Sequence, residues 1–132
     1  MDDSKIKNIL TRSKTVAVVG LSPNPERDSH EVAKYLQEKG YRIFPVNPKI
    51  EQVLGEKAYP GLSSIPEGID VVDIFRQPEH VPAIVDEAIK VGAKTVWMQL
   101  GVVHRDAARK AEEAGLTVVM DRCIMAEHRR LF

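Results

Sequence analysis

The sequence is poor in cysteine and has no excess of charge of either sign. Its 132 residues include a single cysteine, Cys123. No internal disulfide can form, and a reducing compartment such as the cytoplasm is the expected location. Nineteen basic residues balance nineteen acidic ones, so there is no net field that would attract nucleic acid or an anionic membrane. Any anion site must therefore be a local feature.

Long hydrophobic runs are also missing. No stretch reaches the ~18 apolar residues that a membrane-spanning helix needs, and the opening decapeptide MDDSKIKNIL is too charged for a signal peptide. Internal repeats and linkers are absent as well. The length fits one domain covering residues 1–132. The sequence thus predicts a single cytoplasmic domain that has no contact with a membrane.

Residues 15–35 form the stretch around which the chain is organised. The apolar run VAVV ends at Gly20 and is typical of a strand that is buried on both faces of a parallel sheet. Asp28 and Glu31 have the spacing of a capping box, which predicts a helix beginning near Ser29. The free N–H groups and the dipole at such a helix start favour an anion. A strand-loop-helix unit without any ligand is the alternative.

The rest of the chain alternates strands with helices. We expect further strands at 41–46, 71–75, 94–100 and 116–120, helices at 4–11, 78–91, 105–114 and 123–130, and a long connection with one helical turn at 50–69. This alternation predicts an α/β fold with a single Rossmann-like, doubly wound, parallel five-stranded sheet. We expect the strand order 3-2-1-4-5, with the ligand crevice between strands one and four.

The fingerprint of dinucleotide-binding proteins is missing at the first strand-helix turn. After Gly20 the loop has no second or third glycine, so it lacks the close backbone approach to a pyrophosphate that the fingerprint provides. Where an NAD site holds an acidic residue, after the second strand, this chain has Asn47, Pro48 and Lys49. A cation there suits a ligand with a phosphate near its ribose. NADP and coenzyme A both meet this requirement.

Five segments carry a resemblance to a known family. They are VVGLSPNPERDSHEVAKYL at 18–36, GYRIFPVNPK at 40–49, IDVVDIFR at 69–76, VWMQLGV at 96–102 and DRC at 121–123. Through them nearly the whole chain resembles the small CoA-binding proteins, which are related to the CoA-binding domain of the succinyl-CoA synthetase alpha subunit and of acyl-CoA synthetases. The resemblance implies coenzyme A or acyl-CoA as the ligand. The related ligases use an active-site histidine and a nucleotide-binding region in further domains, so ligase activity is not expected here.

The resemblance also implies which residues contact each part of coenzyme A. In chain order they are Gly20, Leu21, Ser22, Arg27, His30, Val46, Asn47, Pro48, Lys49, Phe75, Arg76, Met98, Gln99, Leu100 and Gly101. The first three would touch the pyrophosphate, and Arg27 and His30 would add positive potential there. The next four would flank the adenosine, and the lysine could meet the phosphate on its ribose. Phe75 and Arg76 would cover adenine or contact phosphate, and the last four would line the path of the pantetheine.

Cys123 has two interpretations. It follows the fifth expected strand, at the carboxyl side of the sheet. It is either a small buried hydrophobe or a thiol that faces the pantetheine thiol and can form a mixed disulfide with coenzyme A.

No catalytic or metal-binding pattern emerges from the remaining polar residues. His80, His104 and His128 lack the spacing of metal ligands, and no spacing brings Asp121 and Glu127 together with His128 for acid-base chemistry. We therefore expect a binding protein rather than an enzyme, with an unidentified protein or a second copy as a further partner. An NADP-binding enzyme or redox sensor on the same fold, and an interaction protein with a vestigial crevice, are the alternatives.

Overall fold

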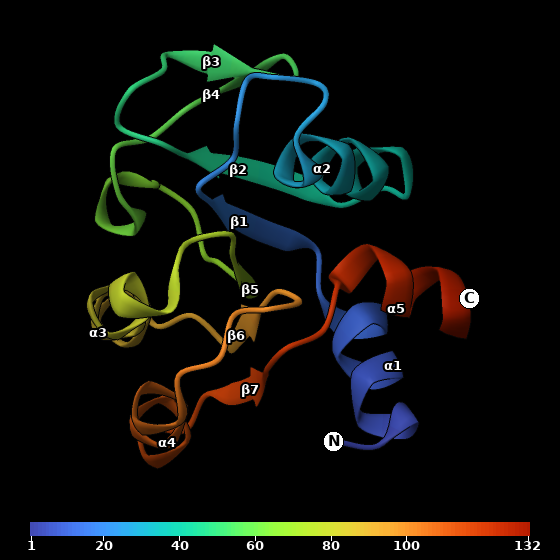
Figure 1. Ribbon diagram of the computed structural model, residues 1–132, viewed down its shortest axis with the longest axis vertical. Coiled ribbons are helices and arrows are strands. Elements are labelled where there is room, and N and C mark those ends of the chain that lie inside the picture. Colours follow the sequence, from blue (N-terminus) through green and yellow to red (C-terminus); the bar gives the residue numbers. More distant parts are fainter.

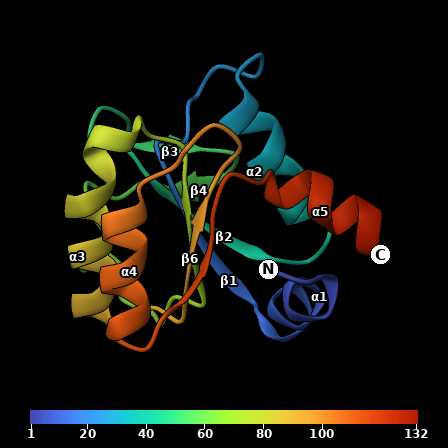
Figure 2. The same cartoon turned by 60° about the horizontal axis from the view of Figure 1, so that its bottom comes forward.

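The computed structural model describes residues 1–132, and its centre is a parallel sheet with helices on both faces (Figure 1). The sheet strands are β1 (Thr15–Val19), β2 (Arg42–Val46), β5 (Val71–Ile74), β6 (Thr95–Met98) and β7 (Thr117–Val119). Helices α1 (Asp3–Arg12), α2 (Asp28–Glu38) and α5 (Ile124–Leu131) lie on one side, and α3 (Val81–Val91) and α4 (Arg105–Glu113) lie on the other (Figure 2). The predicted α/β class, with a doubly wound sheet of five parallel strands, is confirmed.

The order of the strands differs from the prediction. It is β2-β1-β5-β6-β7, so the third strand of the sheet pairs with β1 and not with β2. Pro45 lies within β2 and has no N–H group to donate, which restricts that strand to an edge. All four residues of β5 are buried, as an interior strand requires. The chain therefore changes direction between β1 and β5, and the predicted crevice between strands one and four is corrected to this position.

Alternation along the strands divides the core into two layers. Val16 and Val18 belong to a cluster of 16 buried residues beneath α1, α2 and α5, whereas Ala17 and Val19 belong to one of 20 residues beneath α3 and α4. Because both faces are covered, the buried residues of the strands are apolar except for Asp73 and Thr95, and no strand alternates between a polar and an apolar face in the sequence.

The helix ends partly follow the sequence pattern. Gly92 ends α3 in the left-handed conformation, with φ 76°, as its position predicts. The predicted capping box is wrong: Arg27 is the N-cap of α2 and makes no side-chain cap, and Asp28 is already the first helical residue. Asp28 and Glu31 still lie in the first turn, where the helix dipole favours carboxylates. No helix is long and apolar enough to cross a membrane.

The connection between β2 and β5 contains more structure than the sequence indicates. The predicted helical turn is the 3-10 helix η1 (Leu62–Ser64). Before it, a hairpin forms from β3 (Gln52–Val53) and β4 (Glu56–Lys57), and its turn residues Leu54 and Gly55 both have positive φ, as two-residue hairpin turns require. A second 3-10 turn, η2 (Pro78–His80), leads into α3.

Candidate functional site

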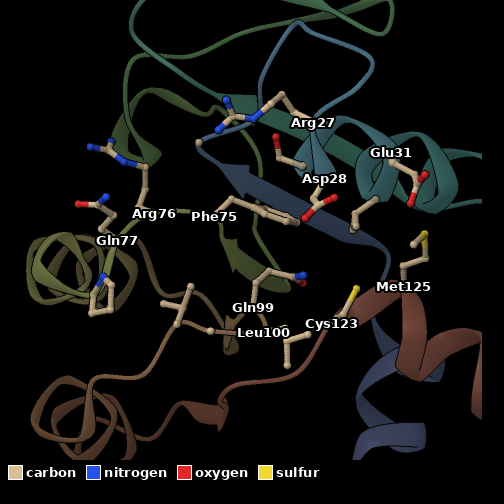
Figure 3. Close-up of a pocket in the computed structure, with 16 residues that line it drawn as sticks. Arg27, Asp28, Glu31, Phe75, Arg76, Gln77, Gln99, Leu100, Cys123 and Met125 are labelled. Carbon is tan, nitrogen blue, oxygen red and sulfur yellow. The ribbon is translucent and has the colours of Figure 1, made fainter.

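A cavity of about 560 Å³ opens where β1, β5 and β6 end, between the starts of α2 and α5 (Figure 3). This is the switch point of the sheet, where open α/β proteins bind their ligands. The residues that line it are Gly20, Arg27, Asp28, Ser29, Glu31, Val32, Phe75, Arg76, Gln77, Pro78, Gln99, Leu100, Gly101, Val102, Cys123 and Met125.

Gly20 allows the ends of β1 and β5 to approach closely at the floor of the cavity. Its φ is +88°, and a Cβ atom at this position would lie 2.5 Å from the carbonyl oxygen of Phe75 and 3.0 Å from Cδ of Arg76. Its N–H group donates to the carbonyl of Val46 at 2.9 Å, which ties the turn to β2 as well. Both the backbone conformation and the space require glycine here.

Side chains hold the loop between β1 and α2 in place. The Ser22 N–H group donates to Oγ of Ser29 at 3.0 Å, and Nδ1 of His30 lies 3.0 Å from the carbonyl oxygen of Ser22. From β2, Nδ2 of Asn47 donates to the carbonyl of Leu21 at 3.0 Å. The loop is therefore fixed before any ligand arrives, so little entropy is lost on binding.

Two guanidinium groups without partners lie at the mouth of the cavity. Arg27 and Arg76 extend there from the start of α2 and from the end of β5 (Figure 3). Neither guanidinium makes an ion pair or a hydrogen bond within the chain, whereas four other arginines pair with carboxylates. Asp28 and Glu31, from the same helix turn, also line the cavity. Unpaired guanidinium groups beside a helix start are suited to binding phosphate.

The opposite end of the cavity is less polar and is built on α5. Gln99 is buried, and its Oε1 accepts from the Ile124 N–H group at 3.0 Å, which fixes the start of the helix. The Gly101 N–H group donates to Asp121 at 2.7 Å. Cys123 is half-buried, and it and Met125 line the wall far from the two arginines (Figure 3).

A charged cluster behind this wall keeps α5 attached to the body of the protein. Glu127 accepts from Arg122 at 2.9 Å and from Arg130 at 2.6 Å, and Arg130 also pairs with Asp3 on α1. Burial raises the pKa of Glu127, but the hydrogen bonds from Arg122 and Arg130 outweigh it and the net pKa lies below the usual range. No group of three or more histidine, cysteine and acidic side chains comes together as metal ligands would.

The structure brings together about half of the residues that the sequence singled out. Those in the cavity wall are Gly20, Arg27, Phe75, Arg76, Gln99, Leu100, Gly101 and Cys123. The others lie elsewhere: Leu21, Val46 and Met98 are packed in the core, Ser22, His30 and Asn47 hold the loop, and Pro48 and Lys49 are exposed after β2.

Eight lining residues were not among the expected ones. They are Asp28, Ser29, Glu31, Val32, Gln77, Pro78, Val102 and Met125. Most lie in the first turns of helices or in the residues directly after strands. In a doubly wound sheet these positions gather at one edge, and this is the pattern that could have identified them.

The fold and the cavity together define an open α/β protein of the Rossmann-like, ligand-binding class, with cationic side chains at the switch point. Residues 14–129 match the family model of the CoA binding domain. The chain belongs to this family.

Relatives of two kinds share this domain. The chain is 46% identical to the protein called uncharacterized protein YneT of Bacillus subtilis, over 95% of this chain and 93% of that one. It is 29% identical to the ADP-forming acetate–CoA ligase I of Archaeoglobus fulgidus, over 84% of this chain but 18% of the ligase. The chain thus spans about a fifth of the length of that ligase.

Solved structures agree with this assignment. A protein of Pyrococcus horikoshii described as hypothetical superposes with a TM-score of 0.97 at 53% identity, covering 99% of this chain and 92% of that one. A Thermus thermophilus protein called cell-free ID.343 superposes with a TM-score of 0.96 at 39% identity, and each chain is covered completely.

Proposed function

We propose that the protein binds coenzyme A or an acyl-CoA in the cavity at the switch point. The observation that carries the proposal is the pair of unpaired guanidinium groups, Arg27 and Arg76, at the mouth beside the start of α2. They would hold the pyrophosphate, because a guanidinium and the N–H groups of a helix start both favour phosphate oxygens. Membership of the CoA binding domain family supports the choice of ligand.

The adenosine end of the ligand is assigned to the turn after β2. Asn47 accepts from the Lys49 N–H group at 2.9 Å, which shapes this turn. The ammonium group of Lys49 is exposed and makes no ion pair in the chain. It is free to meet the phosphate on the ribose, although it lies outside the cavity wall.

We propose a binding module rather than an enzyme. Three polar side chains in or beside the cavity wall hold the backbone: Ser29 accepts from the loop, His30 contacts a loop carbonyl, and Gln99 accepts from the start of α5. These groups shape the cavity, and in this arrangement the proposed role is to carry or sense the ligand.

Titration calorimetry with four ligands on one preparation tests the proposal. Coenzyme A and acetyl-CoA should bind, and NAD and NADPH should not. Tight binding of NADPH without binding of coenzyme A would overturn the proposal and favour an NADP-dependent protein on the same fold.

Charge variants locate the phosphates. Arg27→Gln and Arg76→Gln should each weaken coenzyme A by roughly ten-fold or more, because a hydrogen bond to a charged group contributes about 1.5–3 kcal/mol. Arg109→Gln is the matched control, since Arg109 is exposed on α4 and pairs with Asp106. The Arg109→Gln variant should bind coenzyme A with unchanged affinity.

Lys49→Ala separates the two phosphate sites. It should weaken coenzyme A by ~1.5–3 kcal/mol and leave dephospho-CoA nearly unaffected. Equal losses for both ligands would show that Lys49 does not meet the ribose phosphate.

A further inference from the structure

Asp73 is a buried carboxyl group without a partner. It lies in the middle of β5 with no exposed surface, and neither of its carboxylate oxygens has a hydrogen-bond partner. A buried polar group that lacks a partner destabilises the fold by about 1–3 kcal/mol. Such groups are rare in folded proteins and call for an explanation.

The carboxyl group lies one layer of side chains below the cavity. Asp73 is in register with Val18 on β1 and with Trp97 on β6. Phe75, two residues further along the chain from Asp73, lines the cavity, and so do the residues two positions beyond Val18 and Trp97. Because residues two apart leave a strand on the same face and rise about 7 Å, the ring of Phe75 lies between Asp73 and the cavity.

The surroundings of Asp73 keep it uncharged. Val18 and Trp97 belong to the apolar cluster beneath α2 and α5, together with Val32 and Met125, and the last two also line the cavity. Burial raises the pKa of Asp73 well above its usual range. An uncharged carboxyl can donate a hydrogen bond from its O–H group, which a carboxylate cannot do.

The cavity has a cationic end and a less polar end, and the residues in register with Asp73 belong to the apolar cluster that includes Met125 at the second of these. The two arginines lie at its mouth, and Cys123 and Met125 lie at the opposite end (Figure 3). A ligand whose phosphates stay at the mouth directs its sulfur end towards Cys123 and the apolar cluster. In an acyl-CoA the group next to the sulfur is an uncharged carbonyl followed by an apolar chain, which matches one donor in apolar surroundings.

We propose that Asp73 distinguishes acyl-CoA from free coenzyme A, by donating a hydrogen bond to the thioester carbonyl when the ring of Phe75 turns aside. The inference rests on the proposed function and specifies which form of the ligand the same cavity prefers. It makes Asp73 a specificity-determining residue and Phe75 the side chain that gives access to it. Free coenzyme A ends in a thiol and offers no acceptor of comparable strength at this position.

Calorimetry with coenzyme A and acetyl-CoA on three variants tests the proposal. Asp73→Val should weaken acetyl-CoA by about ten-fold, as the loss of one hydrogen bond implies, and change coenzyme A by less than about two-fold. Asp73→Asn keeps a donor and should retain most of the preference. Thr95→Val is the matched control: Thr95 is equally buried, its hydroxyl also lacks a partner, and its place on β6 lies two residues further from the cavity. It should leave both affinities unchanged.

An infrared measurement on the unmutated protein is independent of how the variants fold. The carbonyl stretching band of the protonated Asp73 should shift when acetyl-CoA is added and should not shift with coenzyme A. The same effect of both ligands on the band, or equal changes in both affinities on Asp73→Val, would overturn the role of Asp73 while coenzyme A binding still stands. If the unmutated protein binds neither ligand, the proposed function fails, and this inference fails with it.

Discussion

Replacing Gly20 by alanine tests the packing that forms the cavity floor. The new methyl group would meet two obstacles. The backbone has φ +88°, and the Cβ atom would lie 2.5 Å from the carbonyl oxygen of Phe75. That oxygen belongs to the backbone directly after the interior strand β5, so it cannot rotate away as a side chain could.

The expected loss of stability has two parts. A left-handed backbone destabilises a residue with a Cβ atom by roughly 1–2 kcal/mol. Forcing β1 and β5 apart by a fraction of an ångström is a case of overpacking, which costs about 1–3 kcal/mol. Together they predict a loss of about 2–5 kcal/mol, a large share of the ~5–15 kcal/mol that stabilises an ordinary domain.

Gly115 provides a control for the first part alone. It follows α4 with φ +91°, and no atom lies within 4 Å of a Cβ atom built there. Gly115→Ala should therefore lose only about 1–2 kcal/mol. Equilibrium urea unfolding, followed by the fluorescence of the buried Trp97, measures both variants.

The difference between the two variants isolates the contact with β5. If Gly20→Ala and Gly115→Ala lose the same free energy, close approach of the strands is not the reason for glycine at position 20. If the difference appears, Gly20→Ala should also weaken coenzyme A, because the same shift displaces Arg76 at the mouth.

Three further predictions follow from single groups. Asp73→Val should stabilise the protein by about 1–3 kcal/mol near pH 7. Because the pKa of Asp73 is raised in the folded state, the unmutated protein should lose stability as the pH rises above 3.8. Urea unfolding at several pH values should show that the variant lacks this dependence of stability on pH. Glu127→Gln should destabilise by about 1–2 kcal/mol near neutral pH; because the pKa of Glu127 is lowered, the difference from the unmutated protein should disappear as the pH falls through and below 4.5. Oxidised coenzyme A should exchange with the thiol of Cys123, leaving a mixed disulfide and releasing one coenzyme A thiol; intact mass should show the adduct, and its absence from protein that still binds coenzyme A would favour the interpretation of Cys123 as a buried hydrophobe.

The sequence pattern predicted the elements of the fold better than their arrangement. Apolar runs and glycine stops located all five sheet strands, because a strand that is buried on both faces appears in the sequence as a nearly continuous apolar run. The order of the strands depends on which edges meet in space, and there the expected 3-2-1-4-5 was wrong. Pro45 held the missing information, since a strand that lacks an N–H donor belongs at an edge.

The residues of the candidate site also fall into those that the sequence could predict and those that it could not. Residues directly after strands, such as Phe75 and Gln99, could be predicted because parallel strands end at one side of the sheet. Val32 and Met125 could not, because each lies on a helix whose rotation and distance from the sheet are set by tertiary packing. The capping box failed for a local reason: Arg27 occupies the N-cap position of α2 without a side-chain cap, and Asp28 comes one residue too late to be the N-cap.

The hydrogen bond between Tyr35 and His128 affects the mechanics of the cavity. The Tyr35 hydroxyl lies 2.7 Å from Nδ1 of His128, so it joins α2 to α5, and the ring of Phe132 stacks on the same histidine. Both helices contribute to the cavity wall, through Val32 on α2 and Met125 on α5, and the bond joins them about one turn further along, outside the wall. The spacing of α2 and α5 at the cavity therefore depends on a hydrogen bond between two residues that do not line the cavity.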